Sequence, residues 1–330
     1  MDWLQKLEQL DEYKKWYLEE LQISDKSIYN DYIRNTEYPA NCWTHSFDYL
    51  WAHTNSDKVY IFKAKVDHML VTFLLTKRGR LYLPCLPYGK GSADEVTKVL
   101  IKGAEFCHTF NKDSNYTHKS TVIPLNEAQL LFLNKSELFR EHFKSEQLSG
   151  LERHYSIPKL VNLQGKDFAK VRNKINKFNR EYKDAIIRPY RDSDFDEVIK
   201  LGEIWVEKSG KKYRKILDGF YFEPIINYHK ELNHIILVIV IDGKIVGLTT
   251  AGVLPTGETW GCLTKFIKSY HGISEKLTIE MAKELHRIIP SAVYLNVGGD
   301  LGSKGLAFAK ERYRPVLSYK RYCLFYKKEK

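Results

Sequence analysis

Basic side chains are concentrated on one segment near the middle of this 330-residue chain. Between positions 159 and 183, eight lysines and arginines stand against two acidic residues, Asp167 and Glu181. Such cations neutralise phosphates without needing base-specific geometry, so the segment indicates contact with a phosphate backbone. The side chains that we expect to make this contact are Lys170, Arg172, Asn173, Lys174, Lys177 and Arg180. The alternative is a solvated helix that bridges two domains.

A glycine turn offers a second place for phosphate chemistry. Gly272 stands in the run Ser269-Tyr-His-Gly-Ile-Ser274, just before an apolar pattern of helical period. Backbone N–H groups at the start of a helix bind anions, so this turn predicts a site for one phosphate. His271 beside it is a candidate base, although a lone histidine in a loop is more often structural.

Composition excludes several classes of protein. With 43% apolar and 13% aromatic residues the chain can bury ordinary cores, and it has no apolar run long enough to span a membrane. Its five scattered cysteines form no CxxC spacing, so we expect neither a metal site nor a redox motif. The N-terminal residues lack the order of a signal peptide, which predicts a cytoplasmic protein.

The net charge of +11 lies entirely in the second half of the chain. Residues 1–158 carry 20 basic and 21 acidic side chains, whereas residues 159–330 carry 32 and 20. This asymmetry favours a polyanionic partner for the second half: nucleic acid, an anionic membrane surface or a phosphorylated ligand. A generally lysine-rich, soluble surface explains the charge alone equally well.

The elements that must position these residues follow one order twice: three strands, a glycine turn, a helix, a strand and a helix. In the first half we predict strands 59–64, 69–75 and 81–86, a helix to about 110 capped by Ser92, strand 120–124 and helix 126–133. In the second half we predict strand 186–189, a helix to about 208, strands 235–241, 245–253 and 258–266, a helix led by residues 271–274, strand 292–296, helix 304–312 and strand 318–326. Residues 2–21 predict one amphipathic helix ahead of both copies.

This order is typical of GNAT-like acyltransferases, and its repetition predicts an α+β protein with two such domains in tandem. Each domain would be a mixed, mostly antiparallel sheet flanked by helices. The predicted borders are 1–25 for an N-terminal helical extension, 26–158 for the first domain, 159–184 for the basic linker helix and 185–330 for the second domain.

Four segments match one family pattern, in the same order along the chain. They are Gly165-Lys-Asp-Phe-Ala-Lys-Val-Arg-Asn-Lys-Ile-Asn-Lys-Phe178, Ile187-Arg-Pro-Tyr190, Thr264-Lys-Phe-Ile-Lys-Ser-Tyr-His-Gly-Ile273 and Asn296-Val-Gly-Gly-Asp-Leu-Gly-Ser-Lys-Gly-Leu-Ala-Phe-Ala-Lys-Glu-Arg-Tyr-Arg-Pro315. Through them the chain resembles the C-terminal domain of phosphatidylglycerol lysyltransferase, from roughly residue 26 to the C-terminus.

The resemblance implies transfer of an aminoacyl group from aminoacyl-tRNA to a lipid, peptide or small-molecule acceptor, without a further cofactor. The implied catalytic residues are Lys310 as the cation at the scissile ester, Asp300 as its orienting group or a proton acceptor, and Tyr313 as a donor to the leaving oxygen. The implied substrate-binding residues are Asn296, Gly272, His271 and Lys265. We also expect tRNA on the basic helix and peripheral contact with an anionic membrane.

Two other functions stay open. An acyl-CoA-dependent N-acyltransferase needs a glycine-rich pyrophosphate loop, and residues 88–93 and 269–274 keep that loop only in part. A catalytically inactive tandem domain that binds RNA or another partner is favoured by two departures from the family pattern. Thr264 stands where a glutamate is usual, and Val297-Gly298 stand where Arg-Glu is usual.

Overall fold

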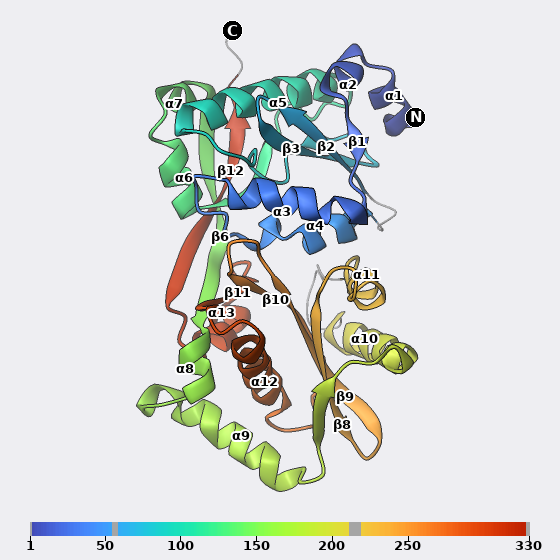
Figure 1. The fold of residues 1–330 in the computed structure, drawn as a ribbon, viewed down its shortest axis with the longest axis vertical. Helices are drawn as coiled ribbons and strands as arrows, with labels where there is room; N and C mark the ends of the chain where they lie inside the picture. Colours follow the sequence, from blue (N-terminus) through green and yellow to red (C-terminus); the bar gives the residue numbers. More distant parts are fainter. Residues whose placement is uncertain (1, 55–58, 211–218, 328–330) are drawn as a thin grey trace. The chain divides into compact units, whose positions relative to one another are not determined.

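The chain forms two compact units, and the computed structural model describes residues 2–54, 59–210 and 219–327. Unit 1 comprises Met1–Glu152 with Tyr319–Lys330, and unit 2 comprises Arg153–Ser318 (Figure 1). Strands β6 (Phe143–Ser156) and β12 (Leu317–Tyr326) run from one unit into the other. The segment 159–184, predicted as a linker, is thus part of unit 2, and residues 319–330 are part of unit 1 rather than of the second half's compact body.

Unit 1 is built on an antiparallel sheet in the order β1-β2-β3-β4. Strands β2 (Val59–Val66) and β3 (Met69–Thr76) pair along their full length, because β3 is an almost continuous buried apolar run. Helix α5 (Ala93–Asp113) begins at the predicted cap, Ser92, which forms a capping box with Glu95. The other helices and strands of this unit are α1 (Trp3–Glu8), α2 (Asp11–Trp16), β1 (Glu19–Glu20), α3 (Lys26–Arg34), α4 (Phe47–Thr54), β4 (Leu81–Tyr82), β5 (Val122–Asn126), α6 (Glu127–Leu133) and α7 (Glu137–His142).

Unit 2 holds a mixed, mostly antiparallel sheet. From β6 its strands follow the order β11-β10-β9-β8-β7, antiparallel from β10 to β7 and parallel between β10 and β11. The predicted α+β class is confirmed. Its elements are α8 (Ile157–Asn162), α9 (Ala169–Glu181), β7 (Ile186–Pro189), α10 (Phe195–Gly210), α11 (Phe222–Asn227), β8 (Ile235–Ile241), β9 (Lys244–Val253), β10 (Thr259–Phe266), α12 (Ile273–Ile288), β11 (Tyr294–Gly299) and α13 (Lys304–Glu311).

Helices cover both faces of the sheet in unit 2 (Figure 1). Alternate residues of the strands point to opposite faces, so neighbouring residues enter different apolar clusters. Ile236 and Val238 pack with α10 and α11, whereas Leu237 packs with α8, α9 and α12. The unit therefore has two separate apolar layers, one on each face of the sheet.

Strands β10 and β11 separate soon after they meet. Among the described residues, Thr259 pairs in register with Leu295 and Trp260 with Asn296. Strand β10 continues beside β9 as far as Phe266, where it pairs with Gly247. The C-terminal part of β10 therefore lies beyond its pairing with β11.

The N-terminal segment differs from the prediction, and the single helix over residues 2–21 is wrong. Two short helices are separated at Leu10, whose backbone is extended, and Tyr17 ends α2 in the left-handed conformation with φ 48°. The chain then pairs as β1 with β2, and Leu21 is buried there. Strand pairing with an existing sheet outweighs the helical period of the apolar residues.

No helix within residues 2–54, 59–210 or 219–327 is long and apolar enough to cross a membrane. The same residues contain no group of three or more His, Cys, Asp or Glu side chains that could hold a metal ion.

Helices α9 and α12 approach each other very closely at Gly272. This residue precedes α12 with φ +82°, and a Cβ atom added there would lie 2.4 Å from the carbonyl oxygen of Lys174 on α9. Phe178 on the same helix would lie 3.1 Å from that Cβ atom. The glycine is therefore required by both the backbone conformation and the packing of α9.

We predict that Gly272→Ala lowers the free energy of unfolding of unit 2 by about 2 kcal/mol or more, because it combines left-handed strain with a backbone clash. The measurement is the urea midpoint, followed by intrinsic fluorescence. Gly305→Ala is the matched control: Gly305 lies inside α13 with open space around it, so alanine should stabilise the protein by up to about 1 kcal/mol. Equal effects of the two substitutions would contradict this packing.

Candidate functional site

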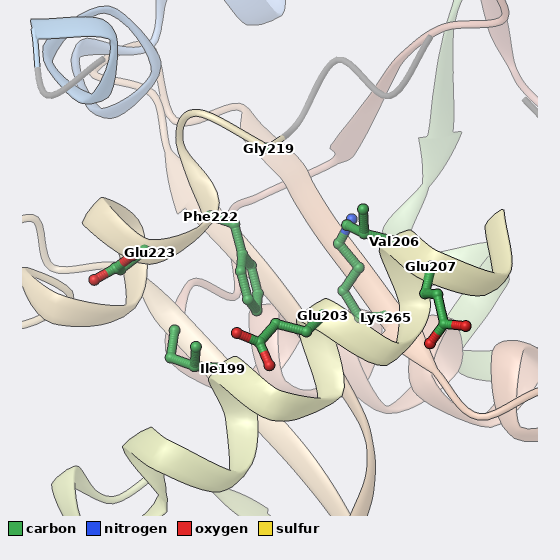
Figure 2. Close-up of a pocket in the computed structure, with 9 residues that line it drawn as sticks. Ile199, Glu203, Val206, Glu207, Gly219, Phe222, Glu223 and Lys265 are labelled. Atoms are coloured by element: carbon green, nitrogen blue, oxygen red, sulfur yellow. The ribbon is translucent and has the colours of Figure 1, made fainter. Parts of the chain in front are cut away.

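A cavity of about 400 Å³ opens on the sheet face that α10 and α11 cover (Figure 2). All of its lining residues belong to unit 2. They are Ile199, Gly202, Glu203, Val206, Glu207, Gly219, Phe222, Glu223 and Lys265. The volume is in the range of small-molecule sites.

Lys265 is the residue of the sheet that lines this cavity. It lies on the part of β10 that has left β11, and it is 1% exposed. Its ammonium nitrogen lies 3.5 Å from the ring centroid of Trp205 and 5.8 Å from that of Phe222. Burying a charge costs several kcal/mol, and the aromatic rings offset part of this cost. A buried charge at a cavity is a candidate for function.

A close helix contact shapes the wall of the cavity. A Cβ atom at Gly202 on α10 would lie 2.3 Å from the ring of Phe222 on α11. The absent side chain therefore lets the Phe222 ring lie against α10. An isolated glycine inside a helical pattern often has such a packing reason, and here it is the sequence feature that marks the pocket.

Three carboxylates stand at the opening. Glu203 and Glu207 lie four residues apart on α10, Glu223 lies on α11, and all three are exposed. In Figure 2 the Glu203 carboxylate lies near the Phe222 ring, whereas Glu223 points away from that ring. The site thus combines a buried ammonium, an aromatic wall and an acidic rim.

The predicted residues Asn296, Asp300 and Lys310 come together at the end of β11. The Asn296 Oδ1 accepts the Gly298 N–H at 2.8 Å, and the Asp300 Oδ2 accepts two bonds from the Arg153 guanidinium at 3.3 and 3.4 Å. Asp300 therefore pairs with Arg153, a residue that the sequence pattern did not single out.

Lys310 is half-buried and ties α13 to β11. Its ammonium donates to the carbonyl oxygens of Gly298 at 3.0 Å, of Gly299 at 2.9 Å and of Val297. An ammonium has three N–H groups, so these three acceptors can occupy all of them. In this geometry Lys310 is a positioning residue, and its predicted contact with a scissile ester stays a prediction.

Tyr313 belongs to the apolar layer of α8 and α12. It is 7% exposed, its ring centroid lies 5.3 Å from that of Tyr155, and burial raises the pKa of its hydroxyl to about 12. The hydroxyl is therefore protonated at neutral pH. Its burial favours a packing role over donation to a leaving group.

The start of α12 already contains an acidic group. Glu275 lies in the first turn, is 2% exposed and accepts from the Lys174 ammonium at 2.8 Å and from Arg312. The helix dipole favours a carboxylate at this end of a helix, as it favours a phosphate. His271 is exposed, with its Nδ1 3.8 Å from a Glu181 carboxylate oxygen. Binding of a phosphate at Gly272 stays a prediction.

Helix α9 presents the predicted basic face only in part. Arg172 donates to the carbonyl oxygens of Gly165 at 2.8 Å and of Leu163, which satisfies the end of α8. Lys174 is paired with Glu275, and Lys177 lies 3.5 Å from Glu181. The predicted residues that are exposed on this helix are Lys170, Asn173, Lys174, Lys177 and Arg180.

A sequence profile described as "Phosphatidylglycerol lysyltransferase, C-terminal" matches residues 44–325. The chain belongs to this family. Among curated proteins none matches it.

Solved structures share the fold at low sequence identity. A conserved protein of unknown function from Bacteroides thetaiotaomicron is 21% identical, with a TM-score of 0.76 over 94% of this chain and 99% of that one. L-PGS from Bacillus licheniformis is 17% identical, with a TM-score of 0.58 over 94% of each chain. A tandem GNAT protein from the clavulanic acid biosynthesis pathway is 9% identical, with a TM-score of 0.50 over 95% of this chain and 99% of that one. The predicted family and GNAT-like fold are both confirmed.

Low pH should lower the free energy of unfolding through His154, which is fully buried on β6 next to Arg153. Burial lowers its pKa to about 4, below the ordinary 6.5, although Glu258 lies 3.9 Å away. The His154 imidazole therefore binds a proton more readily in the unfolded chain than in the folded one. The free energy of unfolding is unaffected by this group above pH 6.5, and it should fall by about 1.4 kcal/mol per pH unit between pH 6.5 and 4. Urea midpoints at half-unit steps of pH measure it.

His45, fully buried with a pKa lowered to about 3 by burial, adds to the same acid sensitivity. The variant His154→Gln isolates the contribution of His154. Between pH 6.5 and 4 its free energy of unfolding should change with pH less steeply than that of the wild type, by the amount that the binding of about one proton contributes. An unchanged slope in the variant would show that His154 is not the neutral buried group described here.

Proposed function

We propose that this protein transfers an aminoacyl group from aminoacyl-tRNA to a lipid, peptide or small-molecule acceptor. Family membership and the GNAT-like fold support an acyltransferase. L-PGS and FemX are among the proteins that share the fold. The donor and acceptor named here are our proposal.

One observation carries the proposal: the cavity beside β10, where this strand has left β11. Aminolysis or alcoholysis of an activated ester needs a sheltered cleft, an oriented acceptor and a positive group for the oxyanion. The cavity offers an apolar, aromatic wall at Phe222 and a buried ammonium at Lys265.

The chemistry assigns distinct tasks to the pocket residues. The acceptor oxygen or nitrogen attacks the ester carbonyl carbon, and Lys265 stabilises the negative charge that develops on the carbonyl oxygen. The Glu203 carboxylate at the rim takes the proton that the acceptor loses. The bond between the carbonyl carbon and the ribose oxygen then breaks, and the ribose oxygen takes the proton that Glu203 received and leaves as a hydroxyl group.

The donor would meet the protein through phosphate contacts. Lys170, Lys177 and Arg180 are exposed on α9, and phosphate neutralisation by such residues depends steeply on salt. We place the reaction in the cytoplasm, where charged tRNA is found, and a lipid acceptor would require contact with an anionic membrane surface.

The test is transfer from a pool of charged tRNA, measured as the loss of labelled aminoacyl-tRNA above spontaneous hydrolysis. Lys265→Met should lower the rate by about a hundred- to a thousandfold, the loss typical of one missing oxyanion donor. Circular dichroism and the urea midpoint show whether the variant is folded under the assay conditions, because removing one partner of a buried contact also costs stability.

Lys268→Met is the matched control, since Lys268 is exposed two residues beyond β10 and lies outside the pocket lining. It should transfer as fast as the wild type. Equal rates for the wild type and Lys265→Met would show that Lys265 takes no part in the reaction. Release of free thiol from acyl-CoA, without deacylation of tRNA, would show that the donor is acyl-CoA.

A further inference from the structure

Helix α13 exposes a large aromatic side chain beside the end of β11. Phe308 is 69% exposed and Leu301, in the preceding turn, is 49% exposed. Lys304 lies one helical turn before Phe308 and is exposed on the same side of the helix. No residue of α13 is buried, so packing does not require a phenylalanine at this position.

Ion pairs place this aromatic side chain in a cationic neighbourhood. Arg314, just after α13, is 55% exposed at its side chain, and its guanidinium lies 3.5 Å from Asp167, next to the start of α9. Glu275 binds both Lys174 of α9 and Arg312. These two links hold the residues that follow α13 against α9 and α12, so Arg312 and Arg314 lie beside the basic helix.

Lys310 fixes the position of this surface relative to the site. Because its ammonium is bound by three carbonyl oxygens of β11, α13 is held at the end of that strand. Strand β11 is the partner from which β10 separates on the way to the cavity. A ligand seated on Phe308 therefore lies beside the end of β11.

We infer that Phe308 is a stacking platform for an unpaired base at the 3′ end of the RNA donor. The inference rests on the proposed function. Aromatic faces stack any base, and flanking lysines and arginines neutralise the adjoining phosphates. A lipid surface fits less well, because one aromatic and one leucine offer little apolar area for insertion. Leu301 borders the platform, and Lys304 and Arg314 meet the phosphates.

The test compares an intact deacylated tRNA with the same tRNA shortened by its unpaired 3′ nucleotides, by fluorescence anisotropy at several salt concentrations. Phe308→Ala should weaken binding of intact tRNA by about tenfold and leave the shortened tRNA unaffected. The slope of affinity against salt should stay the same, because no phosphate contact is lost. Phe308→Trp should restore binding.

Two controls separate stacking from other losses. Ile288→Ala removes another exposed apolar side chain of unit 2, 45% exposed on α12, and should not change affinity. Lys170→Ala with Lys177→Ala should flatten the salt slope for both RNAs. Equal weakening of both RNAs by Phe308→Ala, or no weakening, overturns the inference and leaves the proposed function intact.

The remaining outcomes are also decisive. If Phe308→Ala weakens binding to phosphatidylglycerol vesicles and not to tRNA, the occupant is a membrane and the inference is wrong. If the wild type binds neither form of tRNA at low salt, the inference and the tRNA-dependent function fail together, whereas binding without any transfer contradicts the function alone.

Discussion

One buried positive charge governs how the α10–α11 face of unit 2 is built. The Lys265 ammonium has left water on β10, and an uncompensated charge in that place would cost several kcal/mol. The Trp205 ring lies 3.5 Å from it, and Gly202 lets the Phe222 ring complete the wall. The result is a cavity with an aromatic wall and an acidic rim where an ordinary sheet would carry a solid apolar core.

On the opposite face of the sheet, ion pairs and close packing hold α9, α12 and α13 together. Glu275 is buried between Lys174 and Arg312, and Gly272 allows the start of α12 to lie against the backbone of α9. The basic helix is thus packed into the unit and is not a free linker, and part of its charge is committed to internal pairs. Together with the three carbonyl bonds of Lys310, these contacts fix α9, α13 and the end of β11 as one surface.

Much of the fold follows from local sequence pattern, whereas the site depends on contacts between distant segments. Strands β8 and β9 lie where their apolar runs and the turn at Asp242-Gly243 predict them. No strand is predicted where β6 lies, because its buried stretch contains the polar or charged residues Glu152, Arg153 and His154. The resemblance singled out Lys265, but Trp205 and Phe222 lie on helices whose apolar period is the same whether a residue fills a core or lines a cavity.

The central claim is that the aminoacyl end of the donor occupies the cavity beside β10. Hydrogen exchange measured with tRNA carrying an amide-linked, non-hydrolysable aminoacyl group, against the same tRNA uncharged, tests it most directly. Both RNAs should protect α9. The charged form alone should add protection to residues 199–207 and 259–266, which line the cavity and its strand. Identical protection by the two RNAs, or a difference confined to unit 1, would contradict the account.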